Sequence, residues 1–247
     1  MTNRQPSKAC LSRINKDVRE LQDGSLPGVY AWRSERYTTI IDALIIGPFE
    51  TPYECGFFHF LINCPDDYPH QPPKVKLLTT GHGEFRFGPN LYANGKICLS
   101  ILGTWSGPAW TSIQTLGSVL LSIQSLLCEF PYRCEPGFEN AVGPEVELYN
   151  HAVRYQTLRL AVCNMASLRS EQHRSLPEPM RQRIKELFLS FYEVYELNIE
   201  TNATVVAQLS AGNNIVYNYD ALFSDLKLVL EEITTDMLVS TRREDDV

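Results

Sequence analysis

A chain of 247 residues is long for one ordinary domain and short for two, and its 44% hydrophobic and 21% charged residues predict a soluble globular protein. It has no basic stripe for nucleic acid and no apolar run near the ~18 residues of a membrane span, so we expect neither as a partner. The net charge of −7 lies entirely in residues 171–247, since residues 1–170 carry 15 basic and 15 acidic groups and the remainder carry 7 and 14. That acidic part is either a solvated surface or a docking patch for a basic partner.

The cysteines predict reduced thiols. There are seven, an odd number, and no two of them form a Cys-x-x-Cys pair. This pattern indicates an intracellular protein, cytoplasmic or nuclear, rather than a disulfide framework or a zinc site. The five histidines show no metal-ligand spacing, and no Gly-x-x-x-x-Gly-Lys loop is present. We therefore expect this chain to bind no metal ion and no cofactor, ATP included.

The first part of the chain predicts a helix followed by a meander of strands. Apolar residues recur at helical spacing over 8–22, with Arg13, Lys16 and Arg19 on the outer side. Short β-rich runs follow, separated by Gly-Pro and Thr-Pro turns and by a proline-dense loop over 65–73. Connections this short favour an antiparallel sheet. The expected strands are 29–33, 37–46, 57–63 and 75–78.

The later part predicts a long ordered loop and then helices. Residues 85–110 hold too many Gly, Pro and Asn residues for regular structure. Apolar residues from Ile113 to Leu127 mark a buried helix with Thr111 or Ser112 as its cap. Further apolar stripes of helical spacing lie at 148–165, 180–195 and 220–238. The tail over 241–247 is expected to be disordered.

A polar stretch at 169–175, followed by Pro177 and Pro179, is the best boundary between domains. We expect an α+β core over 8–170 and a helical C-terminal extension over 171–240. Single helices of this length are marginal in water, so the two stripes of the extension must pack on each other or on the core.

One cysteine stands out by its spacing. Cys98 lies eight positions beyond Asn90, and an Asn94-Gly95-Lys96 turn lies between them. The Pro-Asn turn can present a side-chain amide, and the second turn can bring amide and sulfur face to face. Such a pair can form a thioester and stabilise the oxyanion made when that thioester is attacked. Asn90 could instead serve only to hold the turn.

The segment around Cys98 resembles the active site of ubiquitin-conjugating enzymes, whose usual pattern is His-Pro-Asn and, eight positions on, Cys-Leu. The family's Tyr-Pro-x-x-Pro-Pro-x-Val loop is matched upstream by Tyr68–Val75. Downstream, Gly103–Trp110 and Glu135–Glu139 are similar to one subtype, the Z-type enzyme, which has a long C-terminal extension. The resemblance covers about residues 8–170 and continues more weakly beyond.

This resemblance implies a ubiquitin-conjugating fold, a four-stranded antiparallel meander flanked by helices, and an acyltransferase activity. Ubiquitin or a ubiquitin-like modifier would arrive from an ATP-dependent activating enzyme, form a thioester on Cys98, and pass to a lysine or a ligase. Asn90 would hold either the loop or the oxyanion. The implied partners are the modifier, the activating enzyme, ubiquitin ligases and protein substrates.

Further positions carry over by their place in the family's motifs. Gly88 stands where the family has its histidine, and Ser100 stands where many relatives have an acid. Glu135 is a candidate to replace that missing acid, as a gate residue that steers the incoming lysine, or it is a plain loop glutamate. His70, in the proline-dense loop, replaces an apolar residue that ligases grip. The positions assigned to activating-enzyme or ligase contact are Arg13, Lys16, His70, Pro108 and Ala109.

Two other classes of protein remain open. A catalytically weak or inactive variant of the same fold, acting as a ubiquitin-pathway binding module, normally lacks the cysteine. Gly88 and Ser100 mildly favour that alternative, whereas Cys98 opposes it. A thiol hydrolase would need a histidine base and a third group to orient it, and the scattered histidines disfavour it.

Overall fold

The computed structural model describes residues 5–22, 24, 26–209 and 217–245. The chain divides into two compact units, 1–154 and 155–247. We expected the boundary near 170, but the segment from 155 packs with the later helices. It does so through contacts of η3 (Thr157–Cys163) with α7 (Tyr219–Asp245) and of α4 (Asn164–Ala166) with α6 (Glu178–Leu209). The boundary therefore falls inside α3 (Pro144–Gln156), where the sequence has no turn signal.

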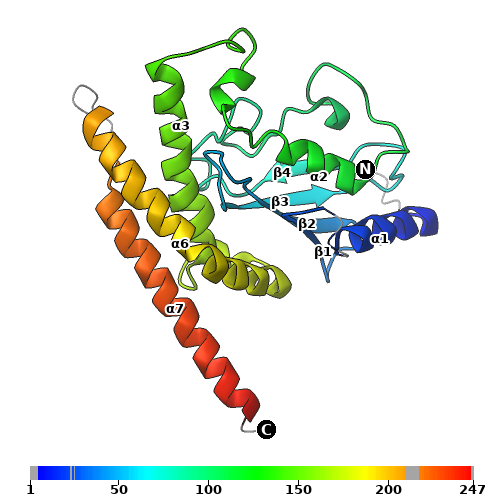
Figure 1. Cartoon of the computed structure of the whole chain (residues 1–247). Coiled ribbons are helices and arrows are strands. Elements are labelled where there is room, and N and C mark those ends of the chain that lie inside the picture. Colours follow the sequence, from blue (N-terminus) through cyan, green and yellow to red (C-terminus); the bar gives the residue numbers. More distant parts are fainter. Residues whose placement is uncertain (1–4, 23, 25, 210–216, 246–247) are drawn as a thin grey trace. The chain divides into compact units, whose positions relative to one another are not determined.

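The first unit is built on one antiparallel sheet in the strand order β1-β2-β3-β4, which confirms the expected meander (Figure 1). The expected strand over 37–46 begins only at Ile40, because the Ile40 N–H donates to the carbonyl oxygen of Tyr37 (3.2 Å) in a turn. The strands are β1 (Val29–Arg33), β2 (Ile40–Ile46), β3 (Phe57–Asn63) and β4 (Lys74–Leu77).

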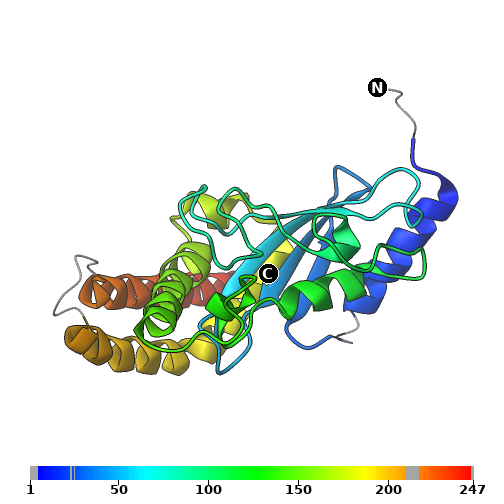
Figure 2. The same ribbon diagram turned by 90° about the horizontal axis from the view of Figure 1, so that it is seen from above.

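The two central strands are buried over most of their length on both faces, which is why they read as almost continuous apolar runs. Helix α1 (Lys8–Gln22) matches the expected range, and its buried side, including Ile14 and Leu21, contacts β1. Figure 2 shows α1 beside α2 (Leu116–Gln124), and the two helices are in contact. The sheet and these helices enclose the hydrophobic core of the unit.

Helix α2 begins later than the sequence indicated. Its cap is Thr115, whose side chain accepts from the N–H of Ser118, while the Ser118 hydroxyl accepts from the Thr115 N–H. This reciprocal capping box satisfies two helix-end donors at once. The expected caps Thr111 and Ser112 are therefore wrong, and Ile113, expected in the core, is 88% exposed.

A chain of aromatic rings connects the sheet to the loop that holds Cys98. Tyr53 and Phe87 both meet Phe58 of β3 edge-on, with ring centroids 5.8 and 5.2 Å away, and Phe85 meets Phe87 at 5.0 Å. Tyr53, Phe58 and Phe87 are completely buried. Edge-to-face pairs favour one orientation in addition to burying area, so they fix the backbone immediately before Gly88.

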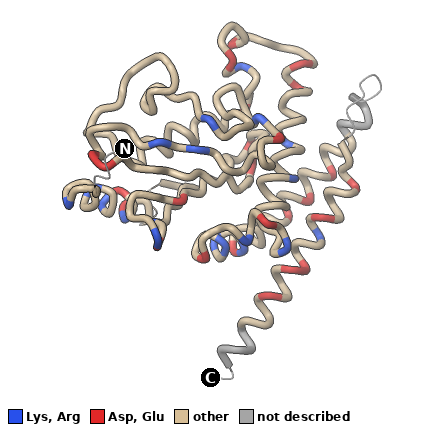
Figure 3. The backbone as a smooth tube through the Cα atoms, turned by 180° about the vertical axis from the view of Figure 1, so that it is seen from behind, with Lys and Arg blue, Asp and Glu red and all other residues tan. Residues whose placement is uncertain are grey.

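The second unit is helical, and its two long helices, α6 and α7, pack on each other. The buried residues of α6 include Ile184 and Phe188, and those of α7 include Leu226 and Ile233, so the two expected amphipathic stripes pack on each other. Lys185 of α6 also pairs with Asp236 of α7 (2.6 Å). Acidic residues recur along both helices (Figure 3).

Two details of the second unit differ from expectation. Residues 171–175, part of the polar stretch expected to mark the domain boundary, form the short helix α5 (Glu171–Ser175), which Ser170 caps by accepting from the His173 N–H. Helix α7 runs to Asp245, so most of the tail expected to be disordered over 241–247 is helical, and residues 246–247 lie outside the described residues. Glu232 of α7 accepts from the N–H of Leu168 (2.8 Å), which ties the chain after α4 to α7.

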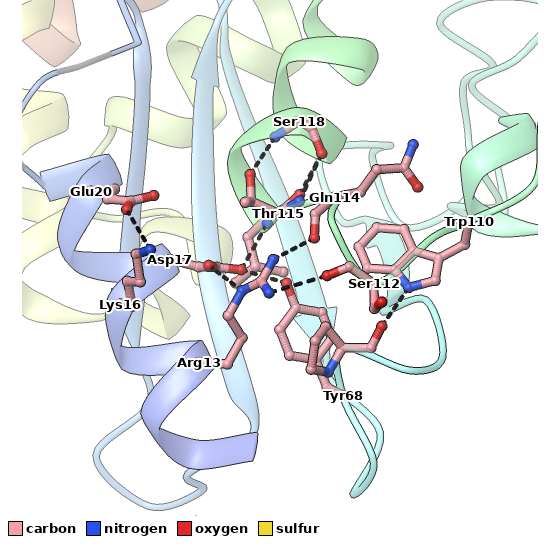
Figure 4. Close-up of polar contacts among 12 residues, drawn as sticks. Arg13, Lys16, Asp17, Glu20, Tyr68, Trp110, Ser112, Gln114, Thr115 and Ser118 are labelled. Carbon is pink, nitrogen blue, oxygen red and sulfur yellow. Dashed lines mark hydrogen bonds and ion pairs between the residues drawn. The ribbon is translucent and has the colours of Figure 1, made fainter. Parts of the chain in front are cut away.

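One buried carboxylate joins three segments of the first unit (Figure 4). Asp17 of α1 accepts hydrogen bonds from the Nε of Arg13 (2.8 Å), the hydroxyl of Tyr68 (2.5 Å) and the backbone N–H of Leu116 (3.2 Å). Its side chain has no exposed surface. Helix α1, the proline-dense loop and the first turn of α2 therefore meet at one charge.

The same contacts turn Arg13 inward. Its guanidinium also donates to the carbonyl oxygens of Ser112 (3.1 Å) and Gln114 (2.6 Å), and its side chain is 23% exposed, against 72% for Lys16. The expectation that Arg13 lies on the outer face with Lys16 is wrong. Burial, helped by the hydrogen bond to Asp17, raises the pKa of Tyr68, so this hydroxyl stays a neutral donor.

We predict that Asp17→Ala lowers the free energy of unfolding by about 3–5 kcal/mol, because it leaves a partly buried guanidinium and two further donors without their acceptor. Urea denaturation of the full chain measures the loss. The matched control is Glu20→Ala on the same helix, which removes an exposed ion pair with Lys16 (3.8 Å) and should cost at most about 1 kcal/mol. Similar small losses in both variants would contradict the role given to Asp17.

Candidate active site

Cys98 lies at the end of a short hairpin that the sequence predicted from its two turns. Leu91 bridges Ile97 across the hairpin, and the N–H of Tyr92 donates to the Lys96 carbonyl oxygen (3.0 Å). Gly95 forms the tip with a φ of 85°, and a Cβ there would lie 2.4 Å from the carbonyl oxygen of Leu77. Only glycine fits this close approach to the end of β4.

Asn90 and Cys98 are joined by two hydrogen bonds. The N–H of Cys98 donates to the carbonyl oxygen of Asn90 (2.9 Å), and the Nδ2 of Asn90 donates to the carbonyl oxygen of Cys98 (3.0 Å). The Asn90 amide therefore contacts the backbone of the cysteine, whereas the spacing predicted that the amide and the sulfur face each other. An amide nitrogen carries two hydrogens, and this bond uses one of them. Cys98 is 3% exposed, so an acyl group must reach the sulfur from one side.

Thr104 holds the other side of the cysteine. Its hydroxyl accepts from the N–H of Leu99 (2.9 Å) and donates to the carbonyl oxygen of Ile97 (2.6 Å). The two residues that flank Cys98 are therefore fixed by one side chain. The loop then continues through the short 3₁₀ helix η1 (Ser100–Leu102). The sequence placed Thr104 within a matched motif but gave no sign of this role.

Arg86 grips the turn that carries Asn90. Its Nε donates to the carbonyl oxygen of Gly88 (3.1 Å) and its Nη2 to that of Pro89 (2.5 Å). The guanidinium also lies over the Tyr92 ring, 4.4 Å from its centroid. A planar fork of this kind fixes two acceptors at a defined angle, which a lysine cannot do. Arg86 was not singled out from the sequence, although its place between Phe85 and Phe87 puts it on the opposite side of an extended segment.

Gly88 lies in a tight, buried position. A Cβ there would lie 3.2 Å from the hydroxyl oxygen of Tyr53, and this hydroxyl donates to the carbonyl oxygen of Phe87 (2.5 Å). Tyr53 and Arg86 therefore support the backbone on either side of the position where the family pattern has a histidine. The turn is held without that side chain.

Glu135 lies close to the same turn. Its carboxylate pairs with Arg86 Nη2 at 3.4 Å, and both side chains are about half exposed. It follows directly after the 3₁₀ helix η2 (Pro131–Cys134). The structure thus brings the candidate gate residue to the arginine that holds Gly88 and Pro89, although the acid is engaged with a cation rather than unpaired.

The two loops assigned to ligase contact are tied together. The indole Nε1 of Trp110 donates to the carbonyl oxygen of Pro69 (2.8 Å), and the Trp110 and Tyr68 rings lie 6.0 Å apart. His70 is the next residue after Pro69 and is exposed, as are Pro108 and Ala109 before the tryptophan. Of the two residues assigned to activating-enzyme contact, Lys16 is exposed, whereas Arg13 is committed to the Asp17 cluster.

Comparison with known proteins agrees with this geometry. Residues 13–155 match the family model described as "Ubiquitin-conjugating enzyme". "Ubiquitin-conjugating enzyme E2 Z" of Danio rerio is 49% identical over 195 residues, which cover 78% of this chain and 58% of that protein. The Homo sapiens protein of the same name is 49% identical over 189 residues, covering 76% and 52%. Human "Dual E2 ubiquitin-conjugating enzyme/E3 ubiquitin-protein ligase BIRC6" is 45% identical over 124 residues, covering 48% of this chain and 3% of that protein.

The sheet, the hairpin that presents Cys98 and the family match together define the class: the chain belongs to the ubiquitin-conjugating enzyme family. It is similar to the E2 Z proteins over three quarters of its own length and spans between about half and three fifths of theirs. Within the part of the chain that the structure describes, no helix is both long and apolar enough to cross a membrane.

We predict that Arg86→Ala loosens the turn at Gly88–Asn90. Loss of the two charge-assisted hydrogen bonds at this partly exposed site should have a net cost of about 1 kcal/mol, which corresponds to about fivefold faster hydrogen exchange of the Cys98 amide. Arg86→Lys should recover only part of the protection, because lysine lacks the fork.

The matched control is Lys96→Ala. Lys96 also lies over the Tyr92 ring, 5.6 Å from its centroid, but it has no contact with the carbonyl groups of Gly88 and Pro89. If Arg86→Ala leaves the exchange of the Cys98 amide unchanged, or if both alanine variants raise it equally, Arg86 does not hold the turn.

Proposed function

We propose that this chain is an acyltransferase of the ubiquitin-conjugating class, which carries ubiquitin or a ubiquitin-like modifier as a thioester on Cys98. The observation that carries the proposal is the set of hydrogen bonds from Asn90 and Thr104 that immobilises the backbone on both sides of this one cysteine. A binding module has no need to orient a thiol in this way. The family match over the same residues supports the same function.

The first step is a thioester exchange. The Cys98 thiolate attacks the carbonyl carbon of the modifier, which arrives as a thioester on an activating enzyme. The resulting tetrahedral oxyanion collapses, the activating enzyme's thiolate leaves, and the modifier stays on Cys98. A thioester is already activated, so position and a polar oxyanion site suffice and no strong base is required. ATP is used upstream, and the chemistry here needs no cofactor on this chain.

The second step is attack on the Cys98 thioester by a lysine amine or by a ligase cysteine. A new amide or thioester bond forms, the attacking group loses its proton, and the Cys98 thiolate leaves. The developing oxyanion lies close to the cysteine backbone, within the region that the Asn90 amide faces. The hydrogen of Nδ2 that is not used by the Cys98 carbonyl is available to donate to it.

The partners follow from the same class. An activating enzyme would dock on α1 at its exposed cations, among which is Lys16, whose side chain is 72% exposed. Ligases would grip the joined loops at His70, Pro108 and Ala109, while Glu135 would steer the incoming lysine. The helical unit over 155–247 would tune which activating enzyme and which modifier are accepted, because its residues from 171 onward carry the net charge of −7.

We predict that Cys98→Ala abolishes formation of a modifier adduct when the chain is incubated with an activating enzyme, ATP and ubiquitin. Cys98→Ser should form a slower oxyester adduct that resists hydroxylamine, because an ester is less reactive than a thioester. Gels run with and without a thiol reductant distinguish the two bonds, because the reductant cleaves a thioester and leaves an oxyester intact. An adduct on Cys98→Ala would assign the modifier to another cysteine.

We predict that Asn90→Ala leaves charging of Cys98 nearly intact and slows discharge to free lysine by about 10²-fold, the typical loss for one oxyanion donor. Single-turnover assays measure the two steps separately. Thr104→Ala is the matched control, since it loosens the other side of the cysteine without removing an oxyanion donor. If both variants slow discharge to the same extent, Asn90 acts only by holding the backbone.

A further inference from the structure

Two cysteines outside the site already described lie sulfur to sulfur. The Sγ atoms of Cys128 and Cys134 are 3.2 Å apart, in hydrogen-bonding contact. Cys128 follows α2 and is half-buried, while Cys134 is the last residue of η2 and is exposed. The remaining five cysteines are all buried. Small oxidants therefore meet this pair first.

From this juxtaposition we propose that Cys128 and Cys134 form an oxidisable dithiol, which a peroxide converts to a disulfide beside the Arg86–Glu135 contact. The site is a modification site, and its substrate is hydrogen peroxide or a small organic hydroperoxide. Nothing in the conjugating chemistry at Cys98 uses these two thiols.

The turn between the two sulfurs is held in place by its own side chains. The Tyr132 ring meets the rings of Phe138 and Tyr149 edge-on, at 5.2 and 5.5 Å. The Nε of Arg133 donates to the carbonyl oxygen of Ala141 (2.9 Å). These contacts keep η2 folded, so the two sulfurs are held close together before any reaction. From 3.2 Å they need to approach by only about 1.2 Å to reach the ~2.05 Å of a disulfide bond.

The surroundings also make one of the two sulfurs a nucleophile. The hydrogen bond from Cys134 lowers the pKa of Cys128 to about 7, helped by the N–H of Phe130 and opposed by burial and by the charge of Glu129. The same hydrogen bond raises the pKa of Cys134, which keeps its proton. Tyr53 and Tyr149 also lie near the pair, and burial raises the pKa of both, so both are neutral near pH 7. The charged neighbours of Cys134 in the chain are Arg133 and Glu135. A thiolate hydrogen-bonded to a thiol is the arrangement that reacts and then resolves.

The reaction balances in two steps. The Cys128 thiolate attacks one oxygen of hydrogen peroxide, the O–O bond breaks, and Cys128 becomes a sulfenic acid while hydroxide leaves and takes up a proton to give water. The Cys134 sulfur then attacks the sulfenic sulfur, the S–O bond breaks, and a second water leaves with the thiol proton. Two thiols are oxidised by two electrons, and one peroxide is reduced to two waters.

The location gives the modification a consequence for the nearby site. Cys134 is followed directly by Glu135, which pairs with Arg86 at 3.4 Å, and Arg86 holds the carbonyl oxygens of Gly88 and Pro89. A disulfide would tie the end of η2 to Cys128, four residues beyond the end of α2. The chain that carries Glu135 would then be anchored covalently one residue away.

Peptide mapping tests the proposal directly, because a trypsin cleavage site lies between the two cysteines. Trypsin cuts after Lys96, Arg133 and Arg154, which separates Cys128 on peptide 97–133 from Cys134 on peptide 134–154. In full-length Cys98→Ala each peptide contains one cysteine. After treatment with hydrogen peroxide, blocking of free thiols and digestion, we expect the two peptides joined, lighter by two hydrogens than their sum, and released by dithiothreitol.

The controls are Cys134→Ser and Cys128→Ser. A serine hydroxyl at 134 still donates to Cys128 but cannot resolve a sulfenic acid, so Cys134→Ser should give no joined peptides and should accumulate a dimedone adduct on Cys128. Cys128→Ser should give neither product. Wild-type protein digested further with chymotrypsin, which cuts after Trp105 and Trp110, separates Cys98 from Cys128 and repeats the result without the Cys98 substitution.

Glutathione in the same tube serves as the reference for the dose of peroxide, which is raised until half of the glutathione is oxidised. If both peptides are recovered blocked as free thiols when half of the glutathione is oxidised, the pair is not an oxidisable dithiol. Joining of either peptide to one that carries a different cysteine also overturns the proposal.

The pH dependence gives a further test of which sulfur attacks. A thiol of pKa about 7 raises its thiolate fraction about tenfold between pH 6 and pH 8 and levels off above, whereas an ordinary thiol with a pKa of 9.0 rises about a hundredfold. We expect the initial rate of disulfide formation to rise about tenfold. A hundredfold rise would remove Cys128 as the attacking sulfur.

Discussion

A single desolvated carboxylate, that of Asp17, organises the first unit. Asp17 is removed from water, and three donors replace its hydration: Arg13 on the same helix, and Tyr68 and Leu116 from segments far along the chain. Burying a charge is unfavourable unless it is fully hydrogen-bonded, so the contacts are strongly interdependent. Helix α1, the loop that carries Tyr68 and the first turn of α2 are specified together, because none of the three can move without exposing or orphaning the charge.

The cysteine itself is held by a different principle. Its neighbours form hydrogen bonds to backbone groups rather than to the sulfur: Asn90 bonds the carbonyl of Cys98, Thr104 bonds the residues on either side, and Arg86 bonds the turn before it. This arrangement suits a chemistry in which the substrate arrives activated and the protein contributes position and a polar surface.

The sequence predicted the sheet closely because its strands are short apolar runs between proline and glycine turns, and β1 and β3 match the expected ranges residue for residue. It also indicated the hairpin between Asn90 and Cys98, since Asn94-Gly95 is a local turn signal. Arg86, Thr104 and Asp17 could not be found in this way. Their roles depend on backbone carbonyl and amide groups that only the folded chain brings near, and such acceptors leave no mark in the pattern of side chains. Arg13 was placed on the wrong side of α1 for the same reason.

The hairpin also limits how the active-site loop can change in length. Side chains along an extended segment alternate between its two faces, so one inserted or deleted residue would move every later side chain to the other face. The Cys98 N–H bonds the Asn90 carbonyl across this hairpin, and Gly95 abuts the Leu77 carbonyl at its tip. Exposed positions such as Asn94 tolerate changes of residue type more readily than the segment tolerates a change of length. Here the count of residues between amide and thiol, more than their identity, is what natural variation has to preserve.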